Sequence, residues 1–166
     1  MNSIEVRYGK IDQVAIYCPN IGLAIENHNT ILGTKEWVRD QVTATGECFG
    51  KEIVGGSIGN LAFNYEMGYE FELLNYQQGD NWHGVRGRDL SKTFLSHKGF
   101  HVEEIDSEKK FLHDTYKIKV AQELFTTDHT NEFLKNNGRK YHYCVFDTLD
   151  DLGWDLKLIQ RLEKDA

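Results

Sequence analysis

Short stretches of alternating apolar and polar residues divide this chain into strands, and longer stretches with helical spacing interrupt them. Residues 11–18 are rich in β-branched and aromatic side chains and stop at Pro19, which cannot continue a strand ladder. From Ile21 apolar residues recur on one face of a helix, which Asn20 can cap and Gly33 can end. Glycine-containing turns then separate three predicted strands, at residues 37–47, 57–66 and 69–76. The predicted order is βαβββ.

The second half of the chain repeats this order. A strand at 94–102 precedes a helix that begins at Asp106 or Ser107 and continues to about Tyr116. The remaining strands, with a short helical turn at 130–138 between the first and second, are at 117–127, 140–148 and 154–162. Gln13 and Glu72 are separated by nearly the same number of residues as His97 and Lys157, which indicates that the chain contains two copies of one module.

The repeat predicts an α+β fold of two tandem βαβββ modules, at 9–76 and 94–163, that form one domain. A polar, glycine-rich loop at 77–93 joins them, and we expect this loop to cross the mouth of a cleft between the modules. With 166 residues, the chain is long enough for two packed half-domains that share a core.

Alternation along the strands predicts which residues share a face. Phe71 and Leu73 should pack beneath the first helix, so that Glu72 faces the other way. Leu156 and Leu158 should do the same beneath the second helix, which leaves Lys157 on the opposite face.

Gln13 and His97, in the opening strands, fall on the same face as the ionisable residues of the closing strands. Polar side chains on the outer face of a sheet need no function, and this simpler interpretation suits Glu70, Asp155 and Lys98. For Gln13, Glu72, His97 and Lys157 the matched spacing instead favours a functional site in the cleft.

Composition and charge exclude several classes of protein. A net charge of −7 and a pI near 5.5 argue against a general nucleic-acid-binding protein. No apolar run approaches the ~20 residues needed to cross a bilayer, and the first residues lack the features of a signal peptide, so we expect a cytoplasmic protein without membrane association. Cys18, Cys48 and Cys144 are far apart and odd in number, which predicts reduced, buried thiols.

The two modules, with opening strands at Ile11–Ile16 and Leu95–Val102, resemble the vicinal oxygen chelate superfamily over residues 9–163. That superfamily includes glyoxalase I, methylmalonyl-CoA epimerase, extradiol dioxygenases, fosfomycin-resistance enzymes and bleomycin-binding proteins. The resemblance implies a glyoxalase-like domain in which a mixed sheet curves into an open half-barrel in each module. The shared cleft holds one divalent metal ion in many members, and members often form homodimers.

The resemblance also implies metal ligands, which in such members come from the opening and closing strands of both modules. The corresponding residues here are Gln13, Glu72, His97 and Lys157, and His101 shares a face with His97. The first three and His101 could bind Mg²⁺, Mn²⁺, Co²⁺, Ni²⁺ or Zn²⁺. Lys157 departs from the family, which commonly has a carboxylate there, because an ammonium has no lone pair to offer a metal.

Two arrangements follow from this departure. Either Gln13, Glu72 and His97, with or without His101, hold a metal while Lys157 turns away, or Lys157 replaces the charge of the metal and pairs with Glu72. The first predicts a metal-dependent lyase or isomerase of a small carbonyl or carboxylate substrate, with Glu72 and Lys157 in catalytic roles. The second favours a metal-free protein that binds small molecules, such as a resistance protein. A third interpretation is a partner-binding protein that kept the fold and lost the site.

Overall fold

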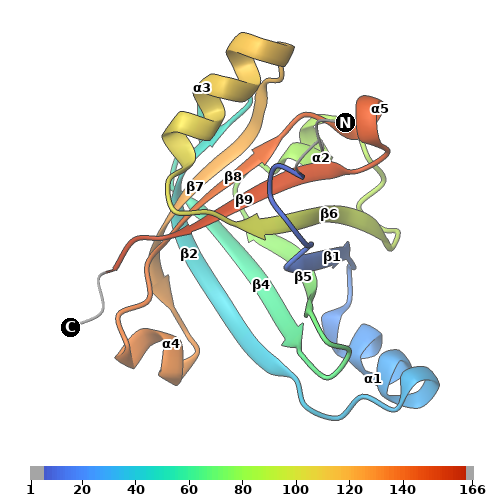
Figure 1. The fold of residues 1–166 in the computed structure, drawn as a ribbon. Coiled ribbons are helices and arrows are strands. Elements are labelled where there is room, and N and C mark those ends of the chain that lie inside the picture. Colours follow the sequence, from blue (N-terminus) through green and yellow to red (C-terminus); the bar gives the residue numbers. More distant parts are fainter. Residues whose placement is uncertain (1–5, 164–166) are drawn as a thin grey trace.

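The computed structural model describes residues 6–163, which form nine strands and five helices. The strands are β1 (Gln13–Tyr17), β2 (Val38–Cys48), β3 (Lys51–Glu52), β4 (Ser57–Asn64), β5 (Glu70–Gln78), β6 (Phe94–His101), β7 (Val120–His129), β8 (Tyr141–Phe146) and β9 (Asp155–Arg161). The helices are α1 (Ile21–Leu32), α2 (Trp82–Val85), α3 (Ile105–Tyr116), α4 (Glu132–Asn136) and α5 (Leu149–Leu152). Figure 1 shows a strongly curved sheet with the longer helices outside it.

All nine strands belong to one mixed sheet, in the order β3-β2-β4-β5-β1-β6-β9-β8-β7. In the first half β1 is parallel to β5, and in the second half β6 is parallel to β9. The antiparallel pair β1–β6 joins the two halves along their opening strands. The α+β class is therefore confirmed, and in each half the opening strand lies beside the closing strand.

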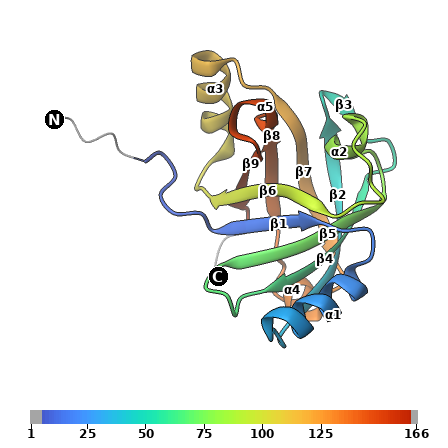
Figure 2. The same cartoon turned by 90° about the vertical axis from the view of Figure 1, so that its right-hand side faces the viewer.

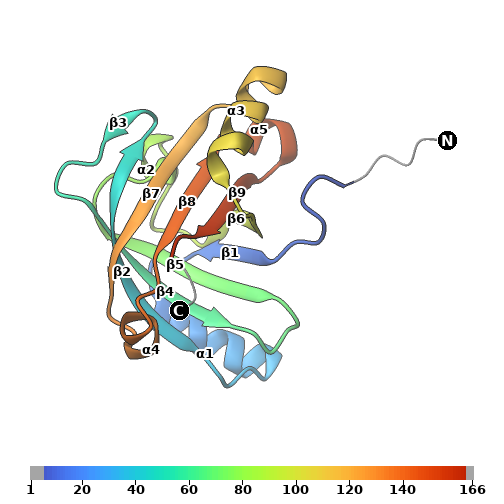
Figure 3. The ribbon, with the colours of Figure 1, turned by 60° about the vertical axis from the view of Figure 1, so that its left-hand side comes forward.

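The sheet does not stay open, because β2 also pairs with β7 and closes it into a barrel (Figure 3). The expectation of open half-barrels was wrong in this respect. Gly46 permits the closure, since a Cβ at this position would lie 1.9 Å from the carbonyl oxygen of Glu123 on β7. Closure pairs the edge strand β7 with β2 and converts the predicted cleft into the interior of a barrel.

The two long helices pack on the outside of the barrel, each over the strands of its own half (Figure 2). Ile21 of α1 lies in a core cluster with Phe71 and Leu73 of β5. The equivalent cluster under α3 combines Ile105 and Leu112 with Phe100, Phe146, Leu156 and Leu158. The predicted alternation is confirmed on both closing strands, because the residues between these apolar ones face the interior.

The helix ends follow the predicted chemistry for α1 and differ for α3. The Asn20 side chain accepts from Leu23 N–H, and Gly33 ends α1 with φ of 73°. For α3 the capping side chain is Glu104, which accepts from the N–H groups of Asp106 and Ser107, so the helix begins at Ile105. A glutamate cap is uncommon, which explains why the sequence pattern indicated a later start.

The segment between β5 and β6 carries α2, which packs into one end of the barrel, opposite the end near α4 (Figures 1 and 3). Trp82 is 1% exposed and His83 is fully buried. This segment therefore closes the barrel at its base rather than crossing an open mouth. The three cysteines are free and buried, as predicted. Among the described residues, no helix is long and apolar enough to span a membrane.

Candidate functional site

The barrel encloses a cavity of about 430 Å³. Its walls are mainly apolar and aromatic, and Trp82 forms part of its floor. Tyr65 and Phe133 also line it and are exposed, so the cavity opens on their side. This volume lies in the range of pockets that hold small ligands. The polar residues that reach it include Gln13, Glu72 and Lys157.

The structure brings together Gln13, Glu72, His97 and Lys157, one from each central strand of the barrel. Each of these residues is at most 8% exposed. Gln13 is paired with Gly99 on β6, and a Cβ there would lie 3.2 Å from both Cβ and Oε1 of Gln13. The glycine leaves room for the Gln13 side chain to extend into the interior.

Close contacts connect the four side chains. The distance from His97 Nε2 to Gln13 Oε1 is 2.9 Å, and Lys157 Nζ donates to the same oxygen at 3.3 Å. Glu72 Oε2 lies 3.6 Å from His97 Nε2 and 3.7 Å from Lys157 Nζ. The Lys157 ammonium also sits over the Tyr143 ring, 4.6 Å from its centroid. One buried carboxylate and one ammonium thus share the centre of the barrel.

Burial alone would raise the pKa of the Glu72 carboxyl, but the charge of Lys157 and the contact with His97 outweigh it, so that the pKa is lowered. Burial, and after it the charge of Lys157, lowers the pKa of His97. At neutral pH the site therefore contains an ionised carboxylate and a neutral imidazole. Glu72 Oε2 is buried and accepts no hydrogen bond from the described residues.

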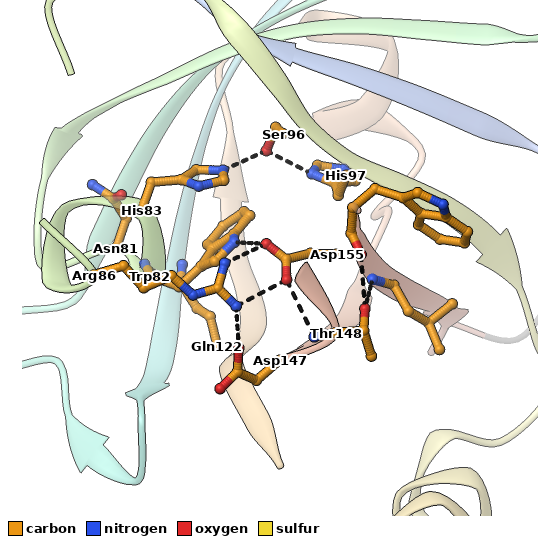
Figure 4. A network of polar contacts seen from close by, with 12 residues as sticks. Asn81, Trp82, His83, Arg86, Ser96, His97, Gln122, Asp147, Thr148 and Asp155 are labelled. Carbon is orange, nitrogen blue, oxygen red and sulfur yellow. Dashed lines mark hydrogen bonds and ion pairs between the residues drawn. The ribbon is translucent and has the colours of Figure 1, made fainter. Parts of the chain in front are cut away.

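A directed chain of hydrogen bonds fixes the tautomer of His97. Gln13 Nε2 donates to a carboxylate oxygen of Glu70, which can only accept, so Gln13 Oε1 faces His97 and Lys157. His97 Nε2 must then carry a proton and donate it to Gln13. Ser96 Oγ lies 2.9 Å from His97 Nδ1 and 2.7 Å from His83 Nε2, so the hydroxyl donates to His97 and accepts from His83 (Figure 4).

These contacts do not fit a divalent ion. A metal at His97 Nε2 would need the lone pair of a nitrogen that here carries a proton, and Gln13 Oε1 already accepts from two donors. Lys157 Nζ lies 3.3 Å from Gln13 Oε1 and 3.7 Å from Glu72 Oε2, so a dication on these oxygens would be repelled by the ammonium. The arrangement is that of the second alternative from the sequence, in which Lys157 pairs with Glu72.

His101 does not join the cluster, although it lines the same cavity. Its side chain is exposed, and in residues 6–163 its ring nitrogens are not grouped with ligand atoms of Glu72 and His97 at a spacing that one ion could bridge. Its backbone N–H donates to Asp12 at 2.8 Å. The proximity of His101 to His97 along β6 therefore does not bring both rings to one point.

A different Asp/Glu/His grouping lies outside the barrel, where single ligand atoms of Asp106, Glu123 and His142 are within 4.8 Å of one another. Lys109 already occupies this place, since its Nζ contacts both carboxylate oxygens of Glu123 at 2.8 and 2.9 Å and approaches Asp106 at 3.9 Å. An ammonium thus supplies the positive charge here as well.

The pattern of alternation could have identified some further residues of the site but not others. Tyr141 and Tyr143 line the cavity, whereas His142 between them points outward and stacks on Phe125. Nothing in the sequence indicated that Ser96 and His83 position His97, because His83 lies in the short helix α2, outside the alternating strands.

The prediction that Asp155 is a polar residue on the outer face of the sheet was wrong. Asp155 is completely buried, not solvent-facing, and it binds the guanidinium of Arg86 and the indole N–H of Trp82 (Figure 4). These contacts hold α2 at the base of the barrel. The sequence of β9 alone could not predict the burial of Asp155, because its partner residues come from the α2 segment.

The buried neutral histidines predict that the protein loses stability in mild acid. Burial lowers the pKa of His83 to about 3, while an unfolded histidine has a pKa near 6.5. Below about pH 6.5 the unfolded chain binds a proton that folded His83 does not, so the free energy of unfolding falls by up to about 1.4 kcal/mol per pH unit. His83→Gln keeps a donor for Ser96 and does not titrate; urea titrations at pH 6.5 and 5.0 should show a smaller loss for this variant.

The exposed His113 of α3 provides the control for this experiment. His113→Gln should lose as much stability between pH 6.5 and 5.0 as the unmodified protein does. An equal loss in His83→Gln would mean that His83 does not contribute to the acid sensitivity.

Comparisons with known proteins bear on the fold. No protein-family model matches the chain, and no curated protein matches it in sequence. A methylmalonyl-CoA epimerase in complex with methylmalonyl-CoA and NH₄⁺ superposes with a TM-score of 0.52 at 14% identity, over 91% of this chain and 93% of the epimerase. A single-residue variant of the Streptomyces coelicolor methylmalonyl-CoA epimerase, in complex with 2-nitronate-propionyl-CoA, superposes with a TM-score of 0.52 at 14% identity. The superposition covers 93% of this chain and 98% of the epimerase. The chain has the vicinal oxygen chelate fold.

A hypothetical protein from Bacillus halodurans C-125 shares this fold with a TM-score of 0.50 at 11% identity, covering 95% of this chain and 97% of its own. At these identities the likeness concerns the fold alone, since one fold can carry many chemistries.

Proposed function

We propose that this protein is an isomerase or lyase of the vicinal oxygen chelate superfamily that moves a proton next to the carbonyl of a small substrate. The observation that carries the proposal is Glu72 Oε2, a buried carboxylate oxygen that accepts no hydrogen bond from the described residues, belongs to a cavity-lining residue and lies 3.7 Å from an ammonium. We also propose that residues 9–76 and 94–163 are duplicated βαβββ modules, joined by 77–93, whose equivalent strands supply the site.

The geometry supports distinct roles for the two charged residues. Glu72 has a lowered pKa and is ionised at neutral pH, so it can accept a proton from the carbon adjacent to a carbonyl. Lys157 can stabilise the negative charge that develops on the carbonyl oxygen as the proton leaves. The apolar walls of the cavity limit water around both groups, which strengthens this electrostatic effect.

His97 and Gln13 are positioning residues in this scheme. The Nε2–H of neutral His97 faces Gln13, and Gln13 Oε1 holds Lys157 Nζ at 3.3 Å. Both residues thereby keep the ammonium close to the carboxylate while leaving Glu72 Oε2 available to the substrate. Fixed donors of this kind need no rearrangement when charge develops during the reaction.

The similar structures support a reaction of this class. Two are epimerases, in complexes with methylmalonyl-CoA and with 2-nitronate-propionyl-CoA, which are acyl thioesters. Inversion of a carbon next to a carbonyl requires removal and return of a proton, which is the step we assign to Glu72. The proposed substrate of this chain is a small carbonyl compound.

Isotope exchange tests the proposal directly. A panel of enolisable ketones, 2-oxoacids and acyl thioesters would be incubated with the protein in D₂O, and loss of the α-proton signal followed by NMR. Catalysed exchange into at least one compound is expected, without added metal. Exchange that occurs only after a divalent metal is supplied would support a metal-dependent mechanism instead. Absence of exchange in every compound would contradict the proposal that the protein is an enzyme of this class.

Metal binding is expected to require replacement of Lys157. Lys157→Glu removes the competing ammonium and adds a carboxylate to Gln13, Glu72 and His97, which yields a ligand set of the type implied by the family resemblance. Thermal melts with Ni²⁺, Mn²⁺ or Zn²⁺ should show a higher Tm in Lys157→Glu and little change in the unmodified protein, since a ligand bound only by the folded state raises Tm. A metal-dependent rise in the unmodified protein would contradict the role of Lys157.

Lys157→Leu is the matched control for that experiment, because it removes the ammonium without adding an atom that can bind a metal. It separates relief of repulsion from creation of a new ligand. A rise in Tm with both variants would assign the exclusion of metal to the charge of Lys157 alone.

The mainly apolar lining of the closed barrel favours a second candidate function, the binding of a small molecule without turnover. A ligand would then be held by Lys157 and by aromatic contacts with Tyr143 and Trp82. Saturable binding without isotope exchange would support this function over the enzymatic one.

A further inference from the structure

The floor of the cavity contains a second polar group that no described residue satisfies. Gln122 of β7 is 1% exposed and lines the cavity. Its Oε1 accepts from the backbone N–H of Trp82 at 3.0 Å, so the amide nitrogen is the atom left over. Gln122 Nε2 is buried and donates no hydrogen bond within residues 6–163. A buried donor without an acceptor is unfavourable, and a ligand could supply that acceptor.

The surroundings of Gln122 are aromatic. Tyr76 lines the cavity, and its ring packs edge-on against Trp82 with centroids 6.1 Å apart. Burial raises the pKa of the Tyr76 hydroxyl, so the phenol is neutral. Two neutral groups, an amide N–H and a phenol, therefore face a largely apolar space.

Register relates this floor to the charged centre. Gln122 and Lys157 are both paired with Val145 of β8, one from each side. They are thus two strand spacings apart, about 10 Å between backbones. A ligand that reaches both must place an apolar body between them, and its far end meets neutral donors rather than a cation.

We propose that Gln122 is a specificity-determining residue, which donates a hydrogen bond to a second, uncharged oxygen of the ligand. The inference rests on the proposed function, in which the reacting carbonyl lies at Glu72 and Lys157. The ligand class is an apolar, aromatic or alicyclic carbonyl compound with an ether or carbonyl oxygen at its far end. A carboxylate at that end is disfavoured, because Gln122 and Tyr76 cannot neutralise a buried charge.

A matched pair of probes tests this assignment. 4-Methoxyphenylacetone and 4-ethylphenylacetone differ only in an ether oxygen that is replaced by a methylene group. Calorimetric or NMR titration of the unmodified protein should show about tenfold tighter binding of the methoxy compound, as expected when a buried donor gains an acceptor. In Gln122→Leu the two affinities should agree to within about twofold.

Two further measurements separate the possible results. Tyr76→Phe leaves the Gln122 amide in place and should keep most of the preference, which guards against an uninformative loss of folding in Gln122→Leu. Equal binding of both probes by the unmodified protein, or no binding of either, would overturn the assignment. α-Proton exchange, measured on the same samples, reports on Glu72 independently. Preferential binding of the methoxy compound without any exchange would support the role of Gln122 and contradict the proposed reaction.

Discussion

Replacement of Glu72 by glutamine is expected to slow α-proton exchange by about 10²- to 10⁴-fold, the usual contribution of a general base. The amide has nearly the same shape but is far too weak a base to take the proton, and its carbonyl oxygen can still face the Lys157 ammonium. Binding of the ketone should change much less, because the apolar walls and Lys157 are retained. The measurement is the initial rate of deuterium incorporation at saturating ketone, which separates a loss in kcat from a change in KM.

Glu47→Gln provides the control for this substitution. Glu47 lies on β2 outside the cavity lining, so the same change of charge occurs away from the site. Its exchange rate should match that of the unmodified protein. A Glu72→Gln protein that folds normally and retains full exchange activity would assign the proton transfer to another residue.

Much of the fold follows from local patterns in the sequence. Alternation along the closing strands placed Phe71 and Leu158 under helices and directed Glu72 and Lys157 inward, as the structure shows. Two-residue periodicity determines sidedness as soon as one face of a strand is apolar, so the residues that meet at the centre could be predicted.

Closure of the barrel could not be predicted in the same way. It depends on the pairing of β2 with β7, which is long-range and needs the missing Cβ of Gly46. A glycine within a strand pattern usually indicates a bulge or a weakened strand, and composition does not identify the strand that packs closely against it. The closed barrel determines that the site is a cavity with a floor.

The polar contacts behind the site were also beyond the reach of sequence patterns. The hydrogen bonds from Gln13 through His97 and Ser96 to His83 join strands in different halves and the short helix α2. These hydrogen bonds fix the tautomer of His97 with the proton on Nε2, which leaves that nitrogen without a lone pair for a metal. Spacing indicated which residues could ligate, whereas the direction of the hydrogen bonds decides whether they do.

Removal of the Asp155 carboxylate is expected to have the largest effect on stability, a loss of about 3–5 kcal/mol in the free energy of unfolding for Asp155→Ala. Asp155 is fully buried and accepts from Arg86 Nη1 and Nη2 at 2.5 and 2.8 Å, from Trp82 Nε1 at 2.9 Å and from Thr148 N–H at 3.3 Å. Its loss leaves a largely buried guanidinium and an indole N–H without their acceptor. Urea unfolding followed by tryptophan fluorescence measures the change.

Asp147→Ala is the matched control, because Asp147 binds the same guanidinium from a position where its side chain is 43% exposed. Solvent screens that pair, and its removal should cost at most about 1 kcal/mol. A comparable loss in both variants would mean that the charge on Arg86, rather than burial of its partner, governs the effect. Because Asp155 also orients Trp82, Asp155→Ala should loosen the floor of the cavity and weaken the discrimination that we assign to Gln122, whereas Asp147→Ala should preserve it.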